Sequence, residues 1–323
     1  MKEGKEAGFG VLIPNLQIAF YYRLKEIRDL YLTDAFKRTI EEINIEKLDR
    51  ELNTYVKAEL LARVASYGLR GEVFFPVPYL LESNPFLLGY YRLLYGLSQK
   101  EFYSKGPFGK FKCLEDRGEI PTRIAQSIRP LCESLIATGG ALIGNIDYLA
   151  IDTVHDLQLL TLGPQFRGSE NTRIGKEAVK EFFELIENLV SGYIKDTTKR
   201  SILIENDSGR KIIIEFSNDP DVRIIQLLPD RYQKILSIEI KGGKDVSNVH
   251  NRLGEAEKSH LKAKNLGYPQ FWTVLKIDVD LPRAKSESPT TTRFFNMDKI
   301  IDAGTEEGRD FRDLVGVLLG IQL

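Results

Sequence analysis

The sequence predicts an α/β (α+β) fold in which a mixed central sheet is flanked by helices and follows a large, mainly helical N-terminal part. Apolar residues recur at helical spacing through the first half, where Gly and Pro separate the segments. After about residue 165, strand-like runs alternate with helical ones. A helix between the last two strands requires a crossover connection, so these strands should be parallel and the sheet mixed.

Helical patterns in the first half cover residues 16–32, 33–43, 45–66, 85–103 and 122–138. From Gly163-Pro164 to Thr172 the chain becomes polar, and we expect a loop there. We therefore divide the chain near residue 165, into a mainly helical region at 1–165 and a second region at 166–323.

The second region is predicted to fold as a helix, two pairs of antiparallel strands, a helix and a last strand. Asn206-Asp-Ser-Gly209 is a good hairpin turn between the first two strands. The apolar face of the first helix consists of Val179, Phe182, Phe183, Ile186 and Val190. In order, these elements cover residues 174–194, 201–205, 211–216, 222–228, 235–240, 248–264 and 271–277.

The composition, 42% apolar and 28% charged, is ordinary for a soluble globular protein of 323 residues. We expect a cytoplasmic protein, because the chain has no membrane-spanning apolar stretch and its first residues lack the apolar core of a secretory signal. Cys113 and Cys132 are too few for a disulfide framework and should be reduced packing residues. The three histidines occur in separate contexts, which argues against a histidine-rich metal site.

The formal net charge of −1 is a weak argument against a nucleic-acid partner, because an enzyme that must release DNA can confine its positive charge to one cleft. The stretch 241–270 contains six Lys or Arg against three Asp or Glu. This part of the chain is therefore locally basic.

Two acidic residues and a lysine stand out in the predicted sheet. Glu239 and Lys241 alternate along one strand, so both side chains project to the same face, while Ile240 points into the core. Asp221 opens the neighbouring strand, and the pairing can bring its carboxylate close to Glu239. Two such carboxylates and the Ile240 carbonyl are hard oxygen ligands that suit Mg²⁺, while Lys241 can orient water and stabilise charge on a phosphate.

The pattern Pro-Asp followed by Glu-x-Lys is weak by itself. An acid two residues before a lysine occurs only at Glu3–Lys5 and Glu239–Lys241, and only the second lies in a strand-like run. Asp230, in a second Pro-Asp, falls in the expected turn and is the weaker candidate. The alternative is an exposed strand edge on which Glu239 and Lys241 form a surface ion pair.

Asp221 and Glu239-Ile240-Lys241, with this order of elements, resemble the PD-(D/E)XK nuclease superfamily. More narrowly, EIKGGKDVSNVHNRLGEAEKSH at 239–260 and NPFLLGYYRLLYGLSQKEFY at 84–103 resemble the XcyI-like type II restriction endonucleases. The resemblance implies a sheet of the restriction-endonuclease-like type. The resemblance also implies that residues 166–323 form the catalytic domain and that residues 1–165 contact DNA and form the dimer.

The same resemblance implies a homodimer that uses Mg²⁺ to cut double-stranded DNA at a short palindrome, CCCGGG or a related CCGG-centred site. A cognate DNA methyltransferase would act on the same site, and no membrane partner is expected. Two alternatives remain: a structure-selective resolvase or repair nuclease of the same fold, and a non-catalytic DNA-binding module. Superfamily members often add an acid from the first core helix, and here four residues compete: Glu177, Glu181, Glu184 and Glu187.

The helix after Lys241 offers candidates for DNA recognition. One side of it forms an apolar stripe, on which His260 should be a hydrogen-bonded, semi-buried residue: Val249, Leu253, Ala256, His260 and Ala263. Its first turns present polar side chains suited to base edges: Asn248, His250, Asn251 and Arg252. Arg252 would be the most informative reader of a GC-rich site. Between Tyr90 and Lys112, aromatic and basic residues alternate, which fits either a phosphate-gripping surface or a buried aromatic face.

Overall fold

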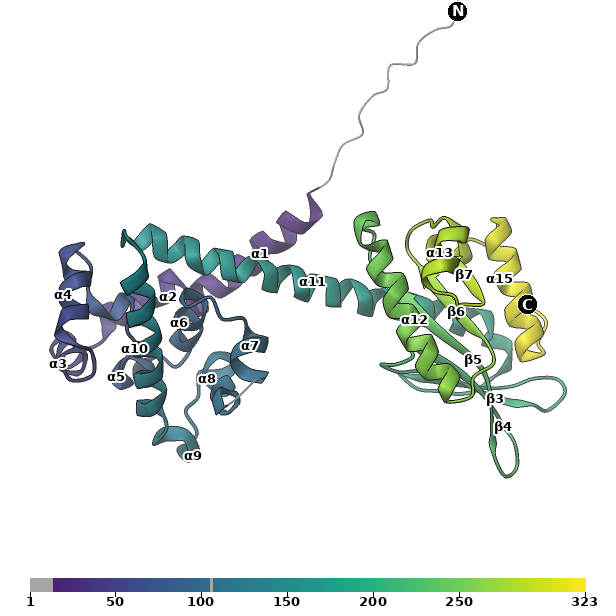
Figure 1. Ribbon diagram of the computed structural model, residues 1–323. Coiled ribbons are helices and arrows are strands. Elements are labelled where there is room, and N and C mark those ends of the chain that lie inside the picture. The colour runs from purple at the N-terminus through teal and green to yellow at the C-terminus, as the bar shows by residue number, and fades with distance from the viewer. Residues whose placement is uncertain (1–13, 105–106) are drawn as a thin grey trace, which may run out of the picture. The chain divides into compact units, whose positions relative to one another are not determined.

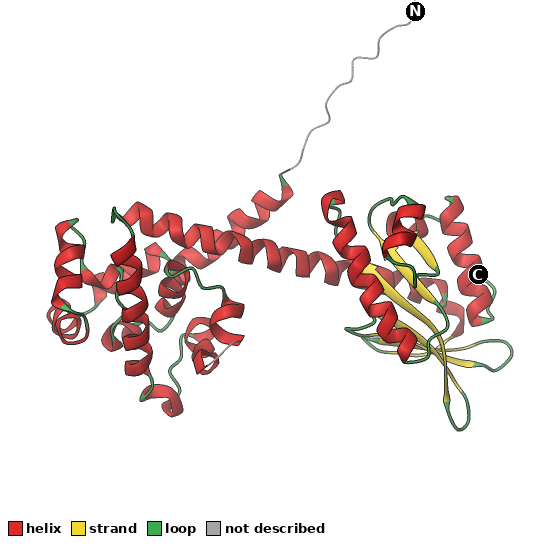
Figure 2. Ribbon diagram, in the orientation of Figure 1, coloured by secondary structure: helices red, strands yellow, loops and turns green. Residues whose placement is uncertain are grey.

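The computed structural model describes residues 14–104 and 107–323, and the chain forms two compact units, Met1–Glu170 and Asn171–Leu323 (Figure 1). Helix α11 (Ile151–Leu189) contributes residues to both units. Every regular element in the described part of the first unit is a helix, and the strands lie in the second unit (Figure 2). The predicted α+β fold, with a large helical N-terminal part, is confirmed.

The first unit buries an apolar core in which Phe74, Phe75, Leu80 and Leu81 are almost completely inaccessible to solvent. Its Cys113 and Cys132 are buried free thiols, as expected. The α-helices that enclose this core before α11 are α1 (Asn15–Tyr31), α2 (Thr33–Glu42), α3 (Ile45–Tyr55), α4 (Ala58–Ser66), α5 (Pro78–Ser83), α6 (Leu87–Leu94), α7 (Gln99–Ser104), α8 (Lys112–Arg117), α9 (Thr122–Ala125) and α10 (Ile128–Asn145). Three of the predicted segments, at 45–66, 85–103 and 122–138, are each divided into two helices.

The polar loop expected from Gly163-Pro164 to Thr172 is wrong, because α11 is helical through all of it. Phe166 of this stretch and Leu162 just before it are buried in one cluster with Ile27 of α1, and this packing outweighs the low helix propensity of Gly and Pro. Pro164 deprives the Leu160 carbonyl of its helical donor, but Leu160 is 72% exposed, so water can replace that donor. The predicted boundary near residue 165 therefore falls inside a helix.

The second unit contains a seven-stranded sheet in which each strand pairs with the next strand along the chain. Strands β1 to β5 are antiparallel, whereas β5, β6 and β7 are parallel to one another. The parallel pairing of β5 with β6, across the helix that joins them, was predicted. Their bounds are β1 (Ile194–Thr197), β2 (Ser201–Glu205), β3 (Lys211–Phe216), β4 (Val222–Leu227), β5 (Tyr232–Lys241), β6 (Phe271–Leu275) and β7 (Arg293–Asn296). The two edge strands, β1 and β7, were not predicted.

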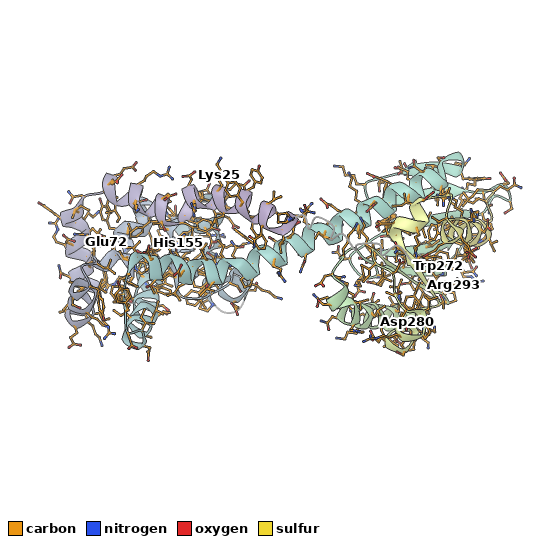
Figure 3. The ribbon with its side chains drawn as sticks, turned by 90° about the horizontal axis from the view of Figure 1, so that it is seen from above. Lys25, Glu72, His155, Trp272, Asp280 and Arg293 are labelled. Atoms are coloured by element: carbon orange, nitrogen blue, oxygen red, sulfur yellow. The ribbon has the colours of Figure 1, made fainter. Side chains whose placement is uncertain are left out.

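Helices cover both faces of this sheet. On one face α11 and α15 (Glu306–Leu319) enclose the apolar core, where the labelled Trp272 in Figure 3 is only 1% exposed. On the other face α12 (Val249–Asn265) lies across β5 (Figure 1). The remaining helices are α13 (Leu281–Glu287) and α14 (Met297–Ile301). Among the described residues, no helix has both the length and the apolar character needed to cross a membrane.

Candidate active site

The pairing of β4 with β5 brings the two predicted acidic residues together. Val222 pairs with Ile238, and the antiparallel register therefore places Asp221 opposite Glu239. Asp221 Oδ2 accepts a hydrogen bond of 2.7 Å from the backbone N–H of Ile240. The strand alternation that turns Ile238 and Ile240 into the core directs Glu239 and Lys241 to the α12 side of the sheet.

Glu239 is buried in the middle of the sheet, with only 4% of its surface exposed. Lys241 Nζ lies 3.1 Å from Glu239 Oε2 and 3.8 Å from Glu255 Oε2, and the Lys241 side chain is 18% exposed. Because β5 is paired on both sides, by β4 and β6, the alternative of an exposed strand edge with a surface ion pair is wrong.

The electrostatic environment of Asp221 disfavours its ionised form. Burial, followed by the nearby charge of Glu239, raises the pKa of Asp221 to about 7, although the Ile240 N–H and Lys241 act in the opposite direction. A carboxyl this close to a second acid gains most from a cation placed between the two. The ionised form of Asp221 beside Glu239 therefore lowers the stability of the folded protein, and such unfavourable placement of charge is typical of a functional site.

The donor set fits a hard divalent cation. Two carboxylates and the Ile240 carbonyl are oxygen donors, and Mg²⁺ usually completes its coordination with water and substrate oxygens. Among the described residues, no three His, Cys, Asp or Glu side chains converge as a metal-binding group. Asp221 and Glu239 are the acidic side chains that face each other across β4 and β5, with Lys241 beside them, and Glu255 lies on the far side of Lys241.

A cavity of about 410 Å³ opens beside this group at the end of β5. Its wall includes Lys241, Gly242 and Gly243 from the strand end, and residues of α11 and α12. A Cβ atom at Gly242 would lie 2.5 Å from the Ala178 Cβ and 2.8 Å from the Ile174 carbonyl oxygen, so only glycine permits α11 to pack this closely. The approach of α11 fixes the path of the chain directly after Lys241.

A profile of the XcyI restriction endonuclease family matches residues 21–322, which include both units almost completely. The chain belongs to the XcyI restriction endonuclease family. The resemblance inferred from Glu239-Ile240-Lys241 and its surroundings is thereby confirmed, and the PD-(D/E)XK fold is the general fold of this family.

Two relatives are similar to this chain over nearly their whole length. The type II restriction enzyme Cfr9I of Citrobacter freundii is 42% identical over 307 residues, which are 93% of this chain and 92% of that enzyme. The type II restriction enzyme XcyI of Xanthomonas campestris pv. cyanopsidis is 41% identical over 315 residues, 95% of each chain. The chain is therefore an enzyme of the type II restriction endonuclease class.

The four residues predicted to read DNA lie at the start of α12, on the rim of the same end of the sheet. Arg252 Nη1 donates to the carbonyl oxygens of Gly243, at 2.7 Å, and Asp245, at 3.0 Å. His250 Nδ1 lies 2.5 Å from Glu287 Oε1, and Asn248 Nδ2 donates to Asp245 Oδ2 at 2.9 Å. Asn251 and Asn248 are exposed, whereas His250 and Arg252 are half-buried.

The acidic residues of α11 are distributed over separate partners. Glu181 forms an ion pair with Lys276, just beyond the end of β6, and Lys276 N donates to the Lys241 carbonyl oxygen at 3.3 Å. Of the other three candidates, Glu177 pairs with Arg173 and Glu184 with Lys180 within the helix, and Glu187 accepts from Thr197 of β1. Glu181 is thus the acid of this helix whose partner adjoins the strand that carries Glu239.

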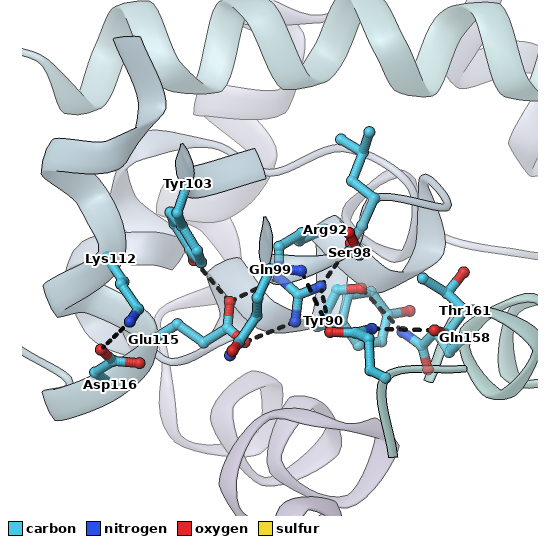
Figure 4. Close-up of polar contacts among 12 residues, drawn as sticks. Tyr90, Arg92, Ser98, Gln99, Tyr103, Lys112, Glu115, Asp116, Gln158 and Thr161 are labelled. Atoms are coloured by element: carbon cyan, nitrogen blue, oxygen red, sulfur yellow. Dashed lines mark hydrogen bonds and ion pairs between the residues drawn. The ribbon is translucent and has the colours of Figure 1, made fainter. Parts of the chain in front are cut away.

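His260 and the Tyr90–Lys112 segment both contribute to the buried interior. His260 is completely buried and its Nε2 lies 2.9 Å from Thr273 Oγ1, so it is the expected core histidine, and burial lowers its pKa to about 4. In the Tyr90–Lys112 segment, Tyr90, Tyr91 and Arg92 are buried, and Arg92 pairs with Glu115 (Figure 4). The buried aromatic face is confirmed for these residues, while Lys100, Lys110 and Lys112 remain exposed and Lys105 lies outside the described residues.

Sequence reasoning missed Ser259, which contacts Glu239, and the two residues linked to it, Asp219 and Lys262. Ser259 of α12 donates to Glu239 Oε1, and also lies 2.7 Å from Asp219 Oδ1. Lys262 Nζ in turn lies 2.6 Å from Asp219 Oδ2. A serine beside the buried stripe of α12 was the available signal, because a hydroxyl at such a position needs a polar partner.

Proposed function

We propose that this restriction enzyme hydrolyses phosphodiester bonds of double-stranded DNA at a short palindromic site, with Asp221, Glu239 and Lys241 as its catalytic residues. The observation that carries the proposal is that the half-buried Asp221 lies opposite the buried Glu239, with Lys241 as the cation beside them. A purely structural carboxylate pair in this position would be costly, because like charges in a desolvated place repel.

In this proposal Asp221, Glu239 and the Ile240 carbonyl hold Mg²⁺. The chemistry supplied by the ion, when it is bound, is Lewis-acid polarisation of a phosphate oxygen and of water. The backbone N–H of Ile240 holds Asp221 Oδ2 in place, which leaves the second oxygen of that carboxylate for the ion. Burial under α12 keeps Glu239 away from bulk water and so strengthens its interactions.

Lys241 has two roles in the proposed reaction. Its ammonium donates hydrogen bonds that orient the attacking water and stabilise the negative charge that develops on the phosphate. Its present partners, Glu239 and Glu255, keep it at the end of β5. Gly242 and Gly243 then let the chain turn away under α11 and α12, so that the ammonium borders the cavity.

A palindromic site presents the same edges to two subunits, so we propose a homodimer with one active site for each strand. Large apolar side chains on α1 support a contact through the first unit: Ile18, Tyr21 and Tyr22 are 48%, 63% and 62% exposed. The start of α12, with Asn248, His250, Asn251 and Arg252, reads the bases. Light scattering with and without cognate DNA tests this assembly, and a strictly monomeric species in both would contradict it.

The resemblance to XcyI-like enzymes leads us to propose CCCGGG, or a related CCGG-centred sequence, as the site, and a cognate methyltransferase that modifies it. The test is digestion of a plasmid of known sequence with Mg²⁺, with EDTA as control, followed by sequencing of the ends. Discrete fragments whose ends share one palindrome support the proposal. Structure-selective nicking, or equal cleavage in EDTA, contradicts it.

A further inference from the structure

The hydroxyl of Ser259 lies between two carboxylates, and we propose that it is a positioning residue that orients Glu239 for metal binding. Ser259 Oγ is within hydrogen-bond distance of Glu239 Oε1 and lies 2.7 Å from Asp219 Oδ1. This inference rests on the proposed function, because Glu239 is assigned there as a metal ligand.

Ser259 is the centre of a continuous chain of polar contacts. At one end Lys262 Nζ lies 2.6 Å from Asp219 Oδ2, and at the other Lys241 Nζ lies 3.1 Å from Glu239 Oε2. The order is therefore ammonium, carboxylate, hydroxyl, carboxylate, ammonium. Lys262 and Asp219 are exposed, whereas Ser259 and Glu239 are 7% and 4% exposed, so the chain leads from solvent into the site.

A serine hydroxyl carries one hydrogen and can donate to one carboxylate at a time. Asp219 has a charged donor of its own in Lys262, whose Nζ lies 2.6 Å from Asp219 Oδ2. Glu239 Oε1 is buried and has Ser259 as its donor. Because Lys262 satisfies Asp219, the Ser259 hydrogen remains available to Glu239.

The bond from Ser259 fixes which way the Glu239 carboxylate faces. Its Oε1 is held toward α12 while Oε2 faces Lys241. Without the hydroxyl, the carboxylate is free to rotate and to share both oxygens with the Lys241 ammonium. That ion pair competes with a metal ion for the same oxygens, so the affinity for the metal falls.

The neighbours of Ser259 on α12 indicate that packing alone does not require a hydroxyl there. Ala256 and Ala263, on the same buried side of the helix, are 0% and 1% exposed and are small and apolar. An alanine at 259 fits this surface and favours the helix. What a serine adds is a hydroxyl that can donate a hydrogen bond to Glu239.

The experiment compares Ser259→Ala with Ser259→Thr, which keeps the hydroxyl, and with the control Ser286→Ala. Ser286 is exposed on α13 and donates within its own helix, to the Arg283 carbonyl oxygen. Binding of Mn²⁺ to each protein without DNA is measured by calorimetry, together with the Mg²⁺ concentration for half-maximal cleavage. Thermal melting in EDTA checks that every variant is folded at the temperature used.

For Ser259→Ala we expect Mn²⁺ binding weaker by about five- to tenfold, with a parallel rise in the Mg²⁺ concentration for half-maximal cleavage. Ser259→Thr and Ser286→Ala should stay within about twofold of the unmodified protein. Metal binding by Ser259→Ala equal to that of Ser286→Ala would overturn the inference, even if its melting temperature were lower. If Ser259→Thr melts below the assay temperature, the comparison of the two alanine variants decides alone.

The outcome also separates this inference from the proposed function. If the unmodified protein binds no Mn²⁺ and cleaves no DNA with Mg²⁺, the proposed function itself is wrong. If the unmodified protein binds and cleaves, and Ser259→Ala does so at the same metal concentrations, only the role of Ser259 is wrong.

Discussion

Glu115 in the first unit is buried and Asp221 in the second is half-buried, and the charges beside these two carboxylates are of opposite sign. Glu115 accepts from Arg92 Nε at 2.8 Å, Arg92 Nη2 at 2.7 Å, Gln99 Nε2 at 2.8 Å and Tyr103 Oη at 2.6 Å (Figure 4). Burial alone would raise the pKa of Glu115, but the bonds and charge of Arg92 outweigh it and hold this pKa below its ordinary value.

Asp221 has a backbone N–H and faces another acid instead of a guanidinium. Burial and Glu239 together raise its pKa to about 7. The Arg92–Glu115 pair is thus complete within the protein, whereas we propose that the pair of Asp221 and Glu239 is completed by a bound cation. Because its charges are balanced, the Arg92–Glu115 cluster is structural, whereas the unbalanced acids Asp221 and Glu239 are candidates for catalysis.

The largest expected effect is on cleavage. Asp221→Ala and Glu239→Ala should each lower the cleavage rate by about a thousandfold or more, because either change removes a metal ligand. Lys241→Ala should lose activity to a similar extent but still bind metal. Plasmid cleavage in Mg²⁺ measures this effect, and circular dichroism shows that the variants are folded.

Asp230→Ala is the matched control, since Asp230 also follows a proline but is exposed in the turn between β4 and β5. It should cleave at the rate of the unmodified protein. Near-full activity of Glu239→Ala in Mg²⁺ would show that the active site lies elsewhere.

The next largest effect concerns the complete pair in the first unit. Arg92→Ala should lower the free energy of unfolding by about 3–5 kcal/mol, because it leaves Glu115 buried without its charged partner. Arg129→Ala breaks the exposed pair with Glu133 and should change the free energy of unfolding far less. Urea unfolding of both variants measures the difference, and equal losses would mean that Arg92 contributes no more than a surface ion pair.

Replacing Arg92 should destabilise the protein, whereas replacing Asp221 in the absence of metal should stabilise it. A carboxyl whose pKa is raised in the folded state binds its proton more tightly there than in the unfolded chain. Its contribution to stability is complete below about pH 4, and is lost as the pH rises through about 7. Asp221→Asn cannot ionise, so at pH 8 in EDTA it should be more stable than the unmodified protein by about 2–3 kcal/mol.

Urea unfolding in EDTA at pH 4 and pH 8 tests this expectation, with Asp230→Asn as the exposed control. The gain from Asp221→Asn should appear at pH 8 and be absent at pH 4, and Mg²⁺ at pH 8 should stabilise only the protein that retains Asp221. A gain of the same size at both pH values would mean that it does not come from ionisation of Asp221.

The sequence was sufficient to predict strands and helices where apolar side chains alternate or recur with a clear period. Strands β2 to β5 and helix α12 were predicted because their apolar residues follow the spacing of two or of three to four that buries one face. The same alternation placed Glu239 and Lys241 on one face of β5. Edge strand β1 was not predicted because no residue of it is fully buried, so it has no such alternation.

Contacts between distant segments explain what could not be predicted. The helix through Gly163-Pro164 depends on α1, and a local pattern cannot show this packing. The contact of Ser259 with Asp219 spans 40 residues and depends on how α12 lies across the sheet. Arg92 looked like a candidate for phosphate binding because a buried partner for it, Glu115, could not be identified from spacing.

The smallest effect concerns recognition by Arg252. Its hydrogen bonds to the described residues both use Nη1, and its Nη2 and Nε lie against Gly243. When the side chain turns away from Gly243, the edge formed by Nε and Nη2 can donate to the O6 and N7 acceptors of a guanine. Arg252→Ala should therefore lose about 1–3 kcal/mol of discrimination at a guanine of the site. Binding to cognate and singly substituted duplexes is measured in Ca²⁺, so that no cleavage disturbs the equilibrium.

The control for Arg252 is Lys258→Ala, because Lys258 is an exposed cation of the same helix. Loss of a phosphate contact weakens binding to all sequences alike and flattens the salt dependence. The Arg252 guanidinium packs so closely on Gly243 that a side chain there would overlap it. Arg252→Ala therefore also removes a contact that holds the loop after Lys241. For this reason binding is measured as well as cleavage, because a change in cleavage could come from either the loop or the contact with the base. Equal losses on cognate and substituted DNA would make Arg252 a backbone contact. If Arg252→Ala bound both cognate and substituted DNA as tightly as the unmodified protein, the start of α12 would not be the recognition surface. A surface such as that of Lys100, Lys110 and Lys112 would then be the next candidate.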